Sequence, residues 1–469
     1  MLFVTLIINR EKIMKSLDLQ PTEQNLLETY VKDAIDRNTA LHHFVDFLDT
    51  LEDSWSIAID GQWGSGKTFF VKQAKMIFDA NNPYTNFCRR DVASQVVKTW
   101  KSYYTNEQDR TITPQICIYY DAWAHDSDDD PLYSIIYEIV SSMASDYSFK
   151  EDVNLWSLFT SIIDHIPGLN TKAIIDAIRN NSDPLQKIRE NRSIEEKINN
   201  FLEQILHERG DRIIIIVDEL DRCNPAYAVR LLERIKHYFA HENTTFVFSI
   251  NSKELQNTIK QYYGASFDAG RYLDRFFDYR VALPPANMNK YYSQIGFNDD
   301  LAYYEVAKVV AEHYDFGLRE ISRYYQLIKV CLKQAVPPSE NHIAFAFSDG
   351  KGRRFCLQVI LPIMIGMNFY DSKMYSDFIS GKDASQLIEI VEKVEFKNWL
   401  CENLITSTET LDPSENGKSH ITIGNKLTEV YHAVFCKHYS HLDHETKIGE
   451  TVFNKQNKEL LLKTISTLL

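Results

Sequence analysis

The chain has 469 residues, enough for two or three domains with substantial cores. Its 44% hydrophobic and 25% charged residues are typical of an ordinary globular protein. The formal net charge of −14 argues against broad, non-specific binding of nucleic acid by the surface as a whole.

The apolar start of the chain predicts no membrane segment. Met1–Ile8 is too short to span a bilayer, and no signal-peptide cleavage pattern follows it. A more polar segment begins at Met14, which is therefore a candidate for the true start, and residues 1–20 are treated as an N-terminal extension. The seven cysteines are scattered with no CxxC pair, which predicts reduced, mostly buried thiols in a cytoplasmic protein.

A phosphate-binding loop is the most informative feature of the chain. Residues 61–68 read Gly-Gln-Trp-Gly-Ser-Gly-Lys-Thr and match G-x-x-x-x-G-K-[ST], between an expected strand at Trp55–Ile59 and an expected helix at Phe69–Phe78. The glycines allow backbone angles that let successive N–H groups point at phosphate oxygens. Lys67 would supply charge to the β- and γ-phosphates, and the Thr68 hydroxyl would hold Mg²⁺. The predicted nucleotide-binding residues are Gly61, Gly64, Ser65, Gly66, Lys67, Thr68 and Phe69.

A second strand, Ile116–Tyr120, ends at Asp121, for which we consider a role at the metal or at a water molecule. Trp123, just beyond, is expected to pack at the base of the site. A helical insertion at about 131–209 follows, with helices predicted at Leu132–Ala144, Leu155–Ile166, Thr171–Arg179 and Ser193–Arg209. Ser193 and Glu196 fit a capping box at the start of the last helix.

The third strand supplies the predicted catalytic acids. Ile213–Val217 is a run of β-branched residues without alternation, as expected for a central strand that is covered on both faces. Asp218, at its tip, is predicted to coordinate Mg²⁺, and Glu219 to polarise a water molecule for in-line attack on the γ-phosphate. For Asp221 and Arg222 we favour a local ion pair, with sensing of nucleotide or of a neighbouring subunit by Arg222 as the alternative.

Two further strands, Thr245–Ile250 and Tyr279–Leu283, complete the predicted core. Helical patterns separate the five strands, so the expected fold is an α/β P-loop NTPase core with a mainly parallel sheet covered by helices. Nucleotide would then bind at the carboxyl ends of the strands. The predicted organisation is a core at 21–290, a helical lid at 291–340 and a mostly helical C-terminal domain at 341–469, in which no chemistry is recognisable.

Several of these motifs together resemble the KAP family of P-loop NTPases. The matching segments, in order, are residues 61–68, Tyr120–Trp123, Val217–Cys223, Phe246–Asn251, Arg271–Phe277 and Leu283–Pro285. The resemblance covers roughly residues 20–335 and implies an ASCE-type core with a catalytic glutamate beside the metal-binding aspartate. Many relatives carry transmembrane helices between the two nucleotide-binding motifs. The insertion here has no apolar span of that length, so we expect no transmembrane segment.

The wider resemblance to AAA+-like ATPases implies three further site residues. Asn251, at the end of the fourth strand, would orient the attacking water, with a strand-ending turn as its alternative role. Arg319 would reach the phosphates from the lid, and Arg323, one helical turn on, competes with it. A surface salt bridge is the alternative role. Arg275 resembles an arginine finger supplied to a neighbouring subunit. Arg271 competes for that role, and for both arginines the alternative is pairing with Asp274 and Asp278.

The resemblance implies an ATPase that uses Mg²⁺, with ATP preferred over GTP because no N-K-x-D element follows the core strands. The first functional hypothesis is a motor or switch that controls partner proteins, as a homo-oligomer or with effector subunits. Bacterial relatives are associated with anti-phage defence. The second hypothesis is a nucleotide-gated scaffold with negligible hydrolysis that recruits an effector. The third, a DNA-stimulated ATPase, is disfavoured by the acidic charge.

Overall fold

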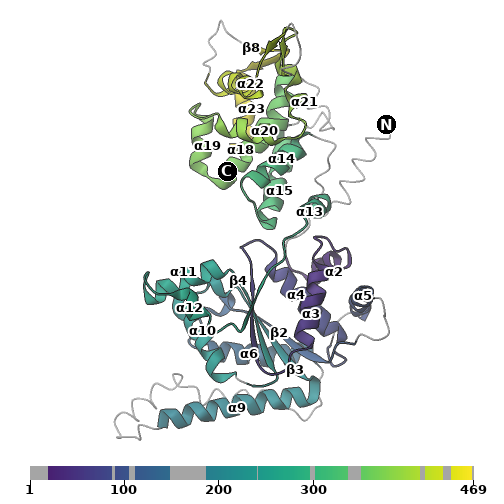
Figure 1. Cartoon of the computed structure of the whole chain (residues 1–469), viewed down its shortest axis with the longest axis vertical. Coiled ribbons are helices and arrows are strands. Elements are labelled where there is room, and N and C mark those ends of the chain that lie inside the picture. The colour runs from purple at the N-terminus through teal and green to yellow at the C-terminus, as the bar shows by residue number, and fades with distance from the viewer. Residues whose placement is uncertain are drawn as a thin grey trace. The chain divides into compact units, whose positions relative to one another are not determined.

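The computed structural model describes residues 20–86, 90–104, 111–147, 186–239, 241–295, 302–335, 350–411, 418–436 and 445–466. The chain divides into two compact units, with the boundary between Tyr291 and Tyr292 (Figure 1). The first unit contains the described residues up to 291 and the second unit contains those from 292 onward. The predicted start at Met14 lies outside the described residues.

A five-stranded parallel sheet forms the centre of the first unit, in the order β2-β3-β4-β1-β5. The strands are β1 (Trp55–Asp60), β2 (Gln115–Asp121), β3 (Arg212–Asp218), β4 (Thr244–Ile250) and β5 (Tyr279–Ala282). All five predicted strands are confirmed, and their ends differ from the predictions by one residue at most. The predicted class, a mainly parallel α/β sheet with flanking helices, is therefore correct.

Helices cover both faces of the sheet because successive strand side chains point to opposite sides. On β3, Ile214 and Ile216 belong to one buried cluster, and Ile213, Ile215 and Val217 belong to the other. The first cluster packs under α2 (Glu23–Val31), α3 (Asn38–Asp49), α4 (Lys67–Asn81) and α5 (Arg90–Lys101). The second packs under α6 (Pro131–Asp146), α9 (Gln186–Arg209), α10 (Pro225–Tyr238), α11 (Ser252–Tyr263) and α12 (Ala269–Leu273). Figure 1 shows these two layers on either side of the strands.

The helical insertion is only partly as predicted. Helix α6 begins at Pro131, where the Asp130 carboxylate caps its first turn by accepting from the Leu132 N–H. Helix α9 begins at Gln186, seven residues before the predicted start. Ser193 therefore lies inside a helix and cannot cap it, so the predicted capping box is wrong. The helices predicted at Leu155–Ile166 and Thr171–Arg179 lie outside the described residues.

None of the described helices combines the length and the apolar character that crossing a membrane requires. The apolar stretch at 357–369 lies within η3 (Cys356–Ile360) and α18 (Leu361–Tyr370) and is almost entirely buried in the second unit. Its hydrophobicity serves the core of that unit.

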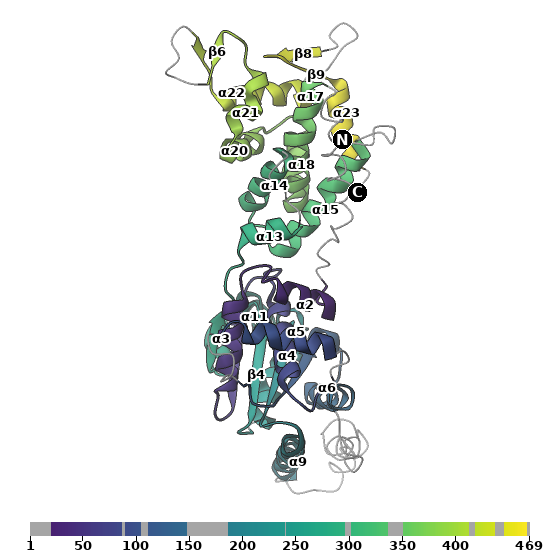
Figure 2. The same cartoon turned by 90° about the vertical axis from the view of Figure 1, so that its right-hand side faces the viewer.

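The second unit is mainly helical. Helices α14 (Ala302–His313) and α15 (Leu318–Ala335) pack against α18, and Figure 2 shows the three side by side. Further helices of the unit are α17 (Lys351–Phe355), α19 (Ser372–Ile379), α20 (Ser385–Lys393), α21 (Lys397–Cys401), α22 (Ile423–Tyr431) and α23 (Lys455–Ser466), with the short turns η4 (Glu402–Leu404) and η5 (His432–Cys436). Two small sheets, β6-β7 (Glu409–Thr410 and Ser419–His420) and β8-β9 (Glu445–Ile448 and Thr451–Asn454), were not predicted. The boundary between lid and C-terminal domain stays a prediction.

Truncation of the central strand should destabilise the first unit. Ile215 lies on β3 and is fully buried in the hydrophobic cluster under α6, α9 and α10. Ile215→Ala removes apolar contacts and leaves a cavity, so we expect a loss of about 3 kcal/mol in the free energy of unfolding. Urea denaturation followed by circular dichroism measures it. The control is Val31→Ala on α2, where Val31 is 45% exposed and the expected change is below about 0.5 kcal/mol. Equal losses in the two variants would contradict the assigned core.

Candidate nucleotide-binding site

Four strands deliver polar residues to one edge of the sheet. Parallel strands share the edge at which they end, and the register pairs Asp121 with Asp218 and Asp60 with Ile250. The loop that starts at Gly61 is joined to β4 by the Gly61 N–H, which donates to the Ile250 carbonyl at 3.1 Å. The loop, the two acids after β3 and Asn251 after β4 therefore meet at this edge.

The glycines of the loop have the conformational roles that the motif requires. Gly64 and Gly66 have φ values of 76° and 93°, in the left-handed region that side chains disfavour. At Gly61 the constraint is steric, because a Cβ there would lie 2.9 Å from Ser65 Oγ and 3.3 Å from Leu283 Cβ. The loop thus forms a tight backbone cradle, as expected for phosphate binding.

Lys67 opens α4 and is largely buried. Its Nζ donates to the Gly61 carbonyl at 2.7 Å and to the Gln62 carbonyl at 3.0 Å, so the ammonium group curls back onto its own loop. Burial lowers the pKa of Lys67, and the nearby carboxylates of Asp221 and Asp218 oppose that shift. A phosphate would satisfy the same ammonium with a full negative charge instead of two carbonyl dipoles.

The other predicted loop residues occupy different environments. Ser65 Oγ is buried without a hydrogen-bond partner, so a ligand that brings hydrogen-bonding groups to this hydroxyl would satisfy it. Thr68 is half-buried on the first turn of α4. The Phe69 side chain packs against the core on the α4 face, which leaves only its backbone N–H for a ligand.

Arg37 contacts the loop and was not predicted. It lies just before α3, is 6% exposed, and donates from Nη1 to the Ser65 carbonyl at 2.7 Å. Burial lowers the pKa of the guanidinium to about 10. The contact fixes the backbone of the loop from outside the motif. A lone arginine 24 residues before Gly61 carries no sequence signal for such a role.

Asp218 is positioned on the same face of the sheet as α4. It is 1% exposed, and its carboxylate accepts from the Tyr119 hydroxyl and the Glu219 N–H, both at 3.0 Å. The alternation along β3 points it toward α4, whose first turn carries Thr68. A carboxylate and a hydroxyl are the hard oxygen donors that Mg²⁺ prefers. The residues present thus fit the predicted metal role of Thr68 and Asp218.

Glu219 adopts a left-handed backbone conformation, with φ of 59°. Such a conformation costs about 1 kcal/mol for a residue with a Cβ. It turns the chain sharply out of β3 into η2 (Leu220–Arg222). The Glu219 carboxylate pairs with Arg222, with 2.6 Å between Oε2 and Nε. Burial raises the pKa of Glu219, the charge of Asp218 raises it further, and Arg222 opposes the shift.

The predicted local ion pair between Asp221 and Arg222 is wrong. Arg222 turns back to Glu219, while Asp221 is buried and accepts from the indole Nε1 of Trp63 at 2.5 Å. Trp123 also differs from expectation. It is 53% exposed and so does not pack at the base of the site, and the Arg222 guanidinium lies over its ring.

Asp121 and Asn251 both have structural partners. The Asp121 Oδ1 accepts from the Trp123 and Ala124 N–H groups at 3.1 Å, which fixes the turn after β2. Asn251 caps α11, where its Oδ1 accepts from the Glu254 N–H at 3.4 Å. Its predicted role in orienting a water molecule stays a prediction.

The candidate arginine finger is exposed. Among the described residues, neither Arg275 nor Arg271 has a side-chain partner in an ion pair. The expected acidic partners bind elsewhere: Asp274 pairs with Arg280 at 2.7 Å, and Asp278 accepts from the Ser56 N–H at 2.8 Å. Arg319 and its competitor Arg323 lie on α15 in the second unit, and their sensor role stays a prediction.

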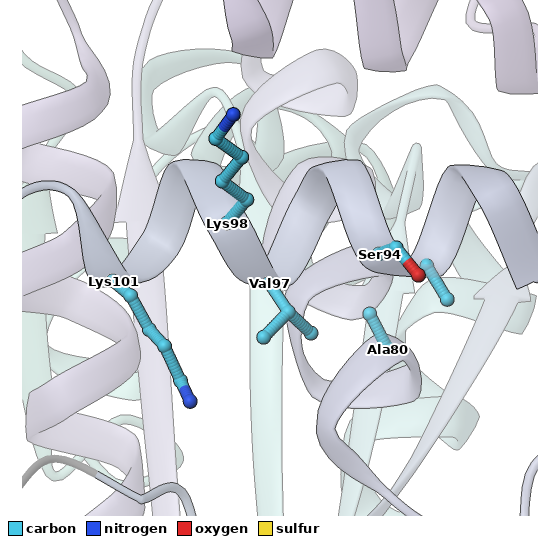
Figure 3. A pocket seen from close by; sticks show the side chains of 6 residues that line it. Ala80, Ser94, Val97, Lys98 and Lys101 are labelled. Carbon is cyan, nitrogen blue, oxygen red and sulfur yellow. The ribbon is translucent and has the colours of Figure 1, made fainter. Parts of the chain in front are cut away.

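Two cavities lie beside α4, and neither is lined by the phosphate-binding loop. One, of about 510 Å³, lies between α4 and α5, where Ser94 and Val97 face Ala80 (Figure 3). Ala80 is near the end of α4 opposite to Lys67, about 20 Å along the helix axis. The second, of about 420 Å³, is lined by Lys72 and Tyr119 among others. The Lys72 Nζ lies 4.0 Å from the centroid of the Tyr119 ring, whose hydroxyl donates to Asp218.

The parallel sheet with a glycine loop on one strand and a buried aspartate on another defines a P-loop NTPase domain, a class that binds nucleotides. The match to the KAP family P-loop domain extends over residues 37–295, more than half of the chain. The chain belongs to the KAP family of P-loop NTPases.

Comparison with individual proteins gives the following similarities. An uncharacterised protein of Methanocaldococcus jannaschii is 26% identical over 164 residues, covering 27% of this chain and 84% of that protein. The solved structure of the Aeropyrum pernix Orc1 protein in complex with DNA aligns over 93% of this chain and 94% of its own. Its sequence identity is 13% and its TM-score is 0.33, a likeness too distant to indicate a shared function.

Loss of the Tyr119 hydroxyl should loosen Asp218. Tyr119→Phe removes one of the two hydrogen bonds to a buried carboxylate, so we expect the Mg²⁺ concentration for half-maximal nucleotide binding to rise about three- to tenfold. Titration of Mg²⁺ with a fluorescent ATP analogue measures it. Tyr120→Phe is the matched control, because Tyr120 points to the opposite face and contacts the Tyr227 hydroxyl. An equal shift in both variants would argue against the assigned role of Asp218.

Proposed function

We propose that this protein binds ATP with Mg²⁺, hydrolyses it, and uses its nucleotide state to control the conformation of partner proteins. One observation carries the proposal: the Lys67 loop follows β1, Asp218 and Glu219 lie at the end of β3, and these parallel strands, on either side of β4, end at the same edge of the sheet. Membership of the KAP family supports it independently. ATP is favoured over GTP because the sequence has no guanine-reading element after the core strands.

Each residue at the edge has a role in this proposal. The N–H groups of residues 61–68 and the Lys67 ammonium bind the phosphates, and Thr68 and Asp218 hold the metal. Bound Mg²⁺ would neutralise charge on the phosphate oxygens. Glu219 accepts the proton of the attacking water, and Asn251 orients that water. Arg275 would act on the site of a neighbouring subunit, with Arg271 as the alternative, and Arg319 would respond from the second unit.

A second candidate function is a nucleotide-gated scaffold with negligible hydrolysis. The contacts that favour it are internal: Lys67 binds the carbonyls of its own loop, and Glu219 is paired with Arg222. Retention of ATP through purification without turnover would support the scaffold. A DNA-stimulated ATPase ranks below both because of the net charge of −14.

The family resemblance adds a biological context to the proposal, namely anti-phage defence in a bacterial host. Phage plating on cells that express the chain tests it. We expect protection by the native chain and none by Lys67→Ala. Protection that persists in Lys67→Ala would separate any defence role from nucleotide binding.

ATP turnover per subunit should rise with protein concentration. If Arg275 is supplied to a neighbouring site, assembly completes that site, so we expect turnover to increase at least tenfold between dilute and concentrated protein. Arg275→Ala should keep the low turnover of the dilute protein at every concentration. A phosphate-release assay over a wide range of protein concentration measures both.

Glu219→Gln is the control for contaminating activity, and it should abolish turnover while ATP binding persists. Turnover that is independent of concentration and unaffected by Arg275→Ala and Arg271→Ala would contradict the finger. Failure of the native chain to bind ATP would contradict the proposed function itself.

A further inference from the structure

Arg222 lies at the junction of three segments that are distant in sequence. Its Nε is paired with the Glu219 carboxylate at 2.6 Å. The centre of its guanidinium is 5.9 Å from the ring of Trp63 in the loop and 5.6 Å from the ring of Trp123 after β2. Both distances are within the range of a cation–π contact. One side chain therefore connects the phosphate loop, the turn after β2 and the predicted catalytic carboxylate.

The Trp63 side chain is attached to the same junction by a second contact. Its indole donates to the buried carboxylate of Asp221, the residue before Arg222. Trp63 nevertheless stays 49% exposed, so the hydrophobic core does not fix its position. It sits between Gly61 and Gly64, the residues that shape the loop. Because Trp63 lies in the loop, a rearrangement of the loop around phosphate would move this indole relative to Arg222.

The ion pair of Glu219 and Arg222 differs from an ordinary surface ion pair because its arginine also contacts the phosphate loop. Arg234 and Asp130 have the same separation of 2.6 Å and similar side-chain exposure, 31% and 16% against 27% and 18%. Arg234, however, lies over the ring of Tyr238 on its own helix, and over no other ring among the residues that the structure describes. The two pairs are chemically matched, and only Arg222 is linked to the loop.

We propose that Arg222 is a positioning residue that withholds the Glu219 carboxylate from water, and that Trp63 makes its release depend on a triphosphate in the loop. The Arg222 guanidinium is paired with Glu219 Oε2, so that a water molecule cannot donate to this oxygen from the same side. Release of Arg222 exposes this acceptor. The inference rests on the proposed ATPase function.

The first experiment uses the fluorescence of the native chain. A non-hydrolysable ATP analogue should change the tryptophan emission, and ADP should change it much less. Trp63→Phe should remove the triphosphate signal, whereas Trp123→Phe should retain most of it. Binding of both nucleotides is measured separately by calorimetry. Equal signals from ADP and the analogue, or a signal that persists in Trp63→Phe, would overturn the inference.

The second experiment measures turnover at saturating ATP. Arg222→Ala should raise kcat about two- to fivefold, the range expected for loss of one partly exposed ion pair, with KM changed less than about twofold. Arg222→Lys keeps the charge and should stay close to the native rate. Arg234→Ala is the matched control and should leave kcat unchanged. Adding Glu219→Gln to Arg222→Ala should abolish the gain.

The outcomes separate the two levels of the proposal. If the native chain binds neither nucleotide, the proposed function fails. If it binds and hydrolyses ATP but Arg222→Ala lowers kcat or leaves it unchanged, only the withholding role fails. Thermal unfolding checks that Arg222→Ala is folded. If that variant does not fold, the fluorescence of the native chain and of Trp63→Phe decides whether the inference stands.

Discussion

Burial of the parallel sheet on both faces is the constraint on which the rest of the structure depends. All seven residues of β3 are buried, and its interior has only aliphatic side chains, because a polar group there would have no partner. Polar residues are therefore confined to the strand ends. At the carboxyl end, Asp218 can stay buried because Tyr119 and the Glu219 N–H satisfy its oxygens. The same constraint concentrates the chemistry of the first unit at one edge.

Each of three charged groups at that edge has a partner within the protein. Lys67 is held by loop carbonyls, Glu219 by Arg222, and Asp221 by the Trp63 indole. Each contact replaces water that burial removes, and each is one that a nucleotide or a water molecule would have to displace. In the proposed function, such a site would bind its ligand by exchanging partners, and this exchange would couple the nucleotide state to the segments that supply those partners.

The sequence predicted the strands well and the side-chain partners poorly, and the reasons are physical. Apolar runs between polar ends mark buried parallel strands, so all five were found. The capping box at Ser193 was wrong because helix α9 already begins at Gln186, and a Ser and a Glu three residues apart do not by themselves start a helix. The pairing of Arg222 was wrong because residues 219, 221 and 222 are all within local reach, and only the left-handed turn at Glu219 selects among them.

The sequence by itself determined the class of this protein, because the glycine loop and the acid pair are local patterns whose chemistry requires those residues at that spacing. It also determined that the loop and the acids would share an edge, since parallel strands end together. Only the tertiary structure decided that Arg37 fixes the loop, that Trp123 lies on the surface, and that Trp63 and Glu219 meet at Arg222. The contact of Arg37 with Ser65 joins residues 28 positions apart, and the contact of Trp63 with Arg222 joins residues 159 positions apart. No local pattern encodes which distant side chains the folded chain brings together.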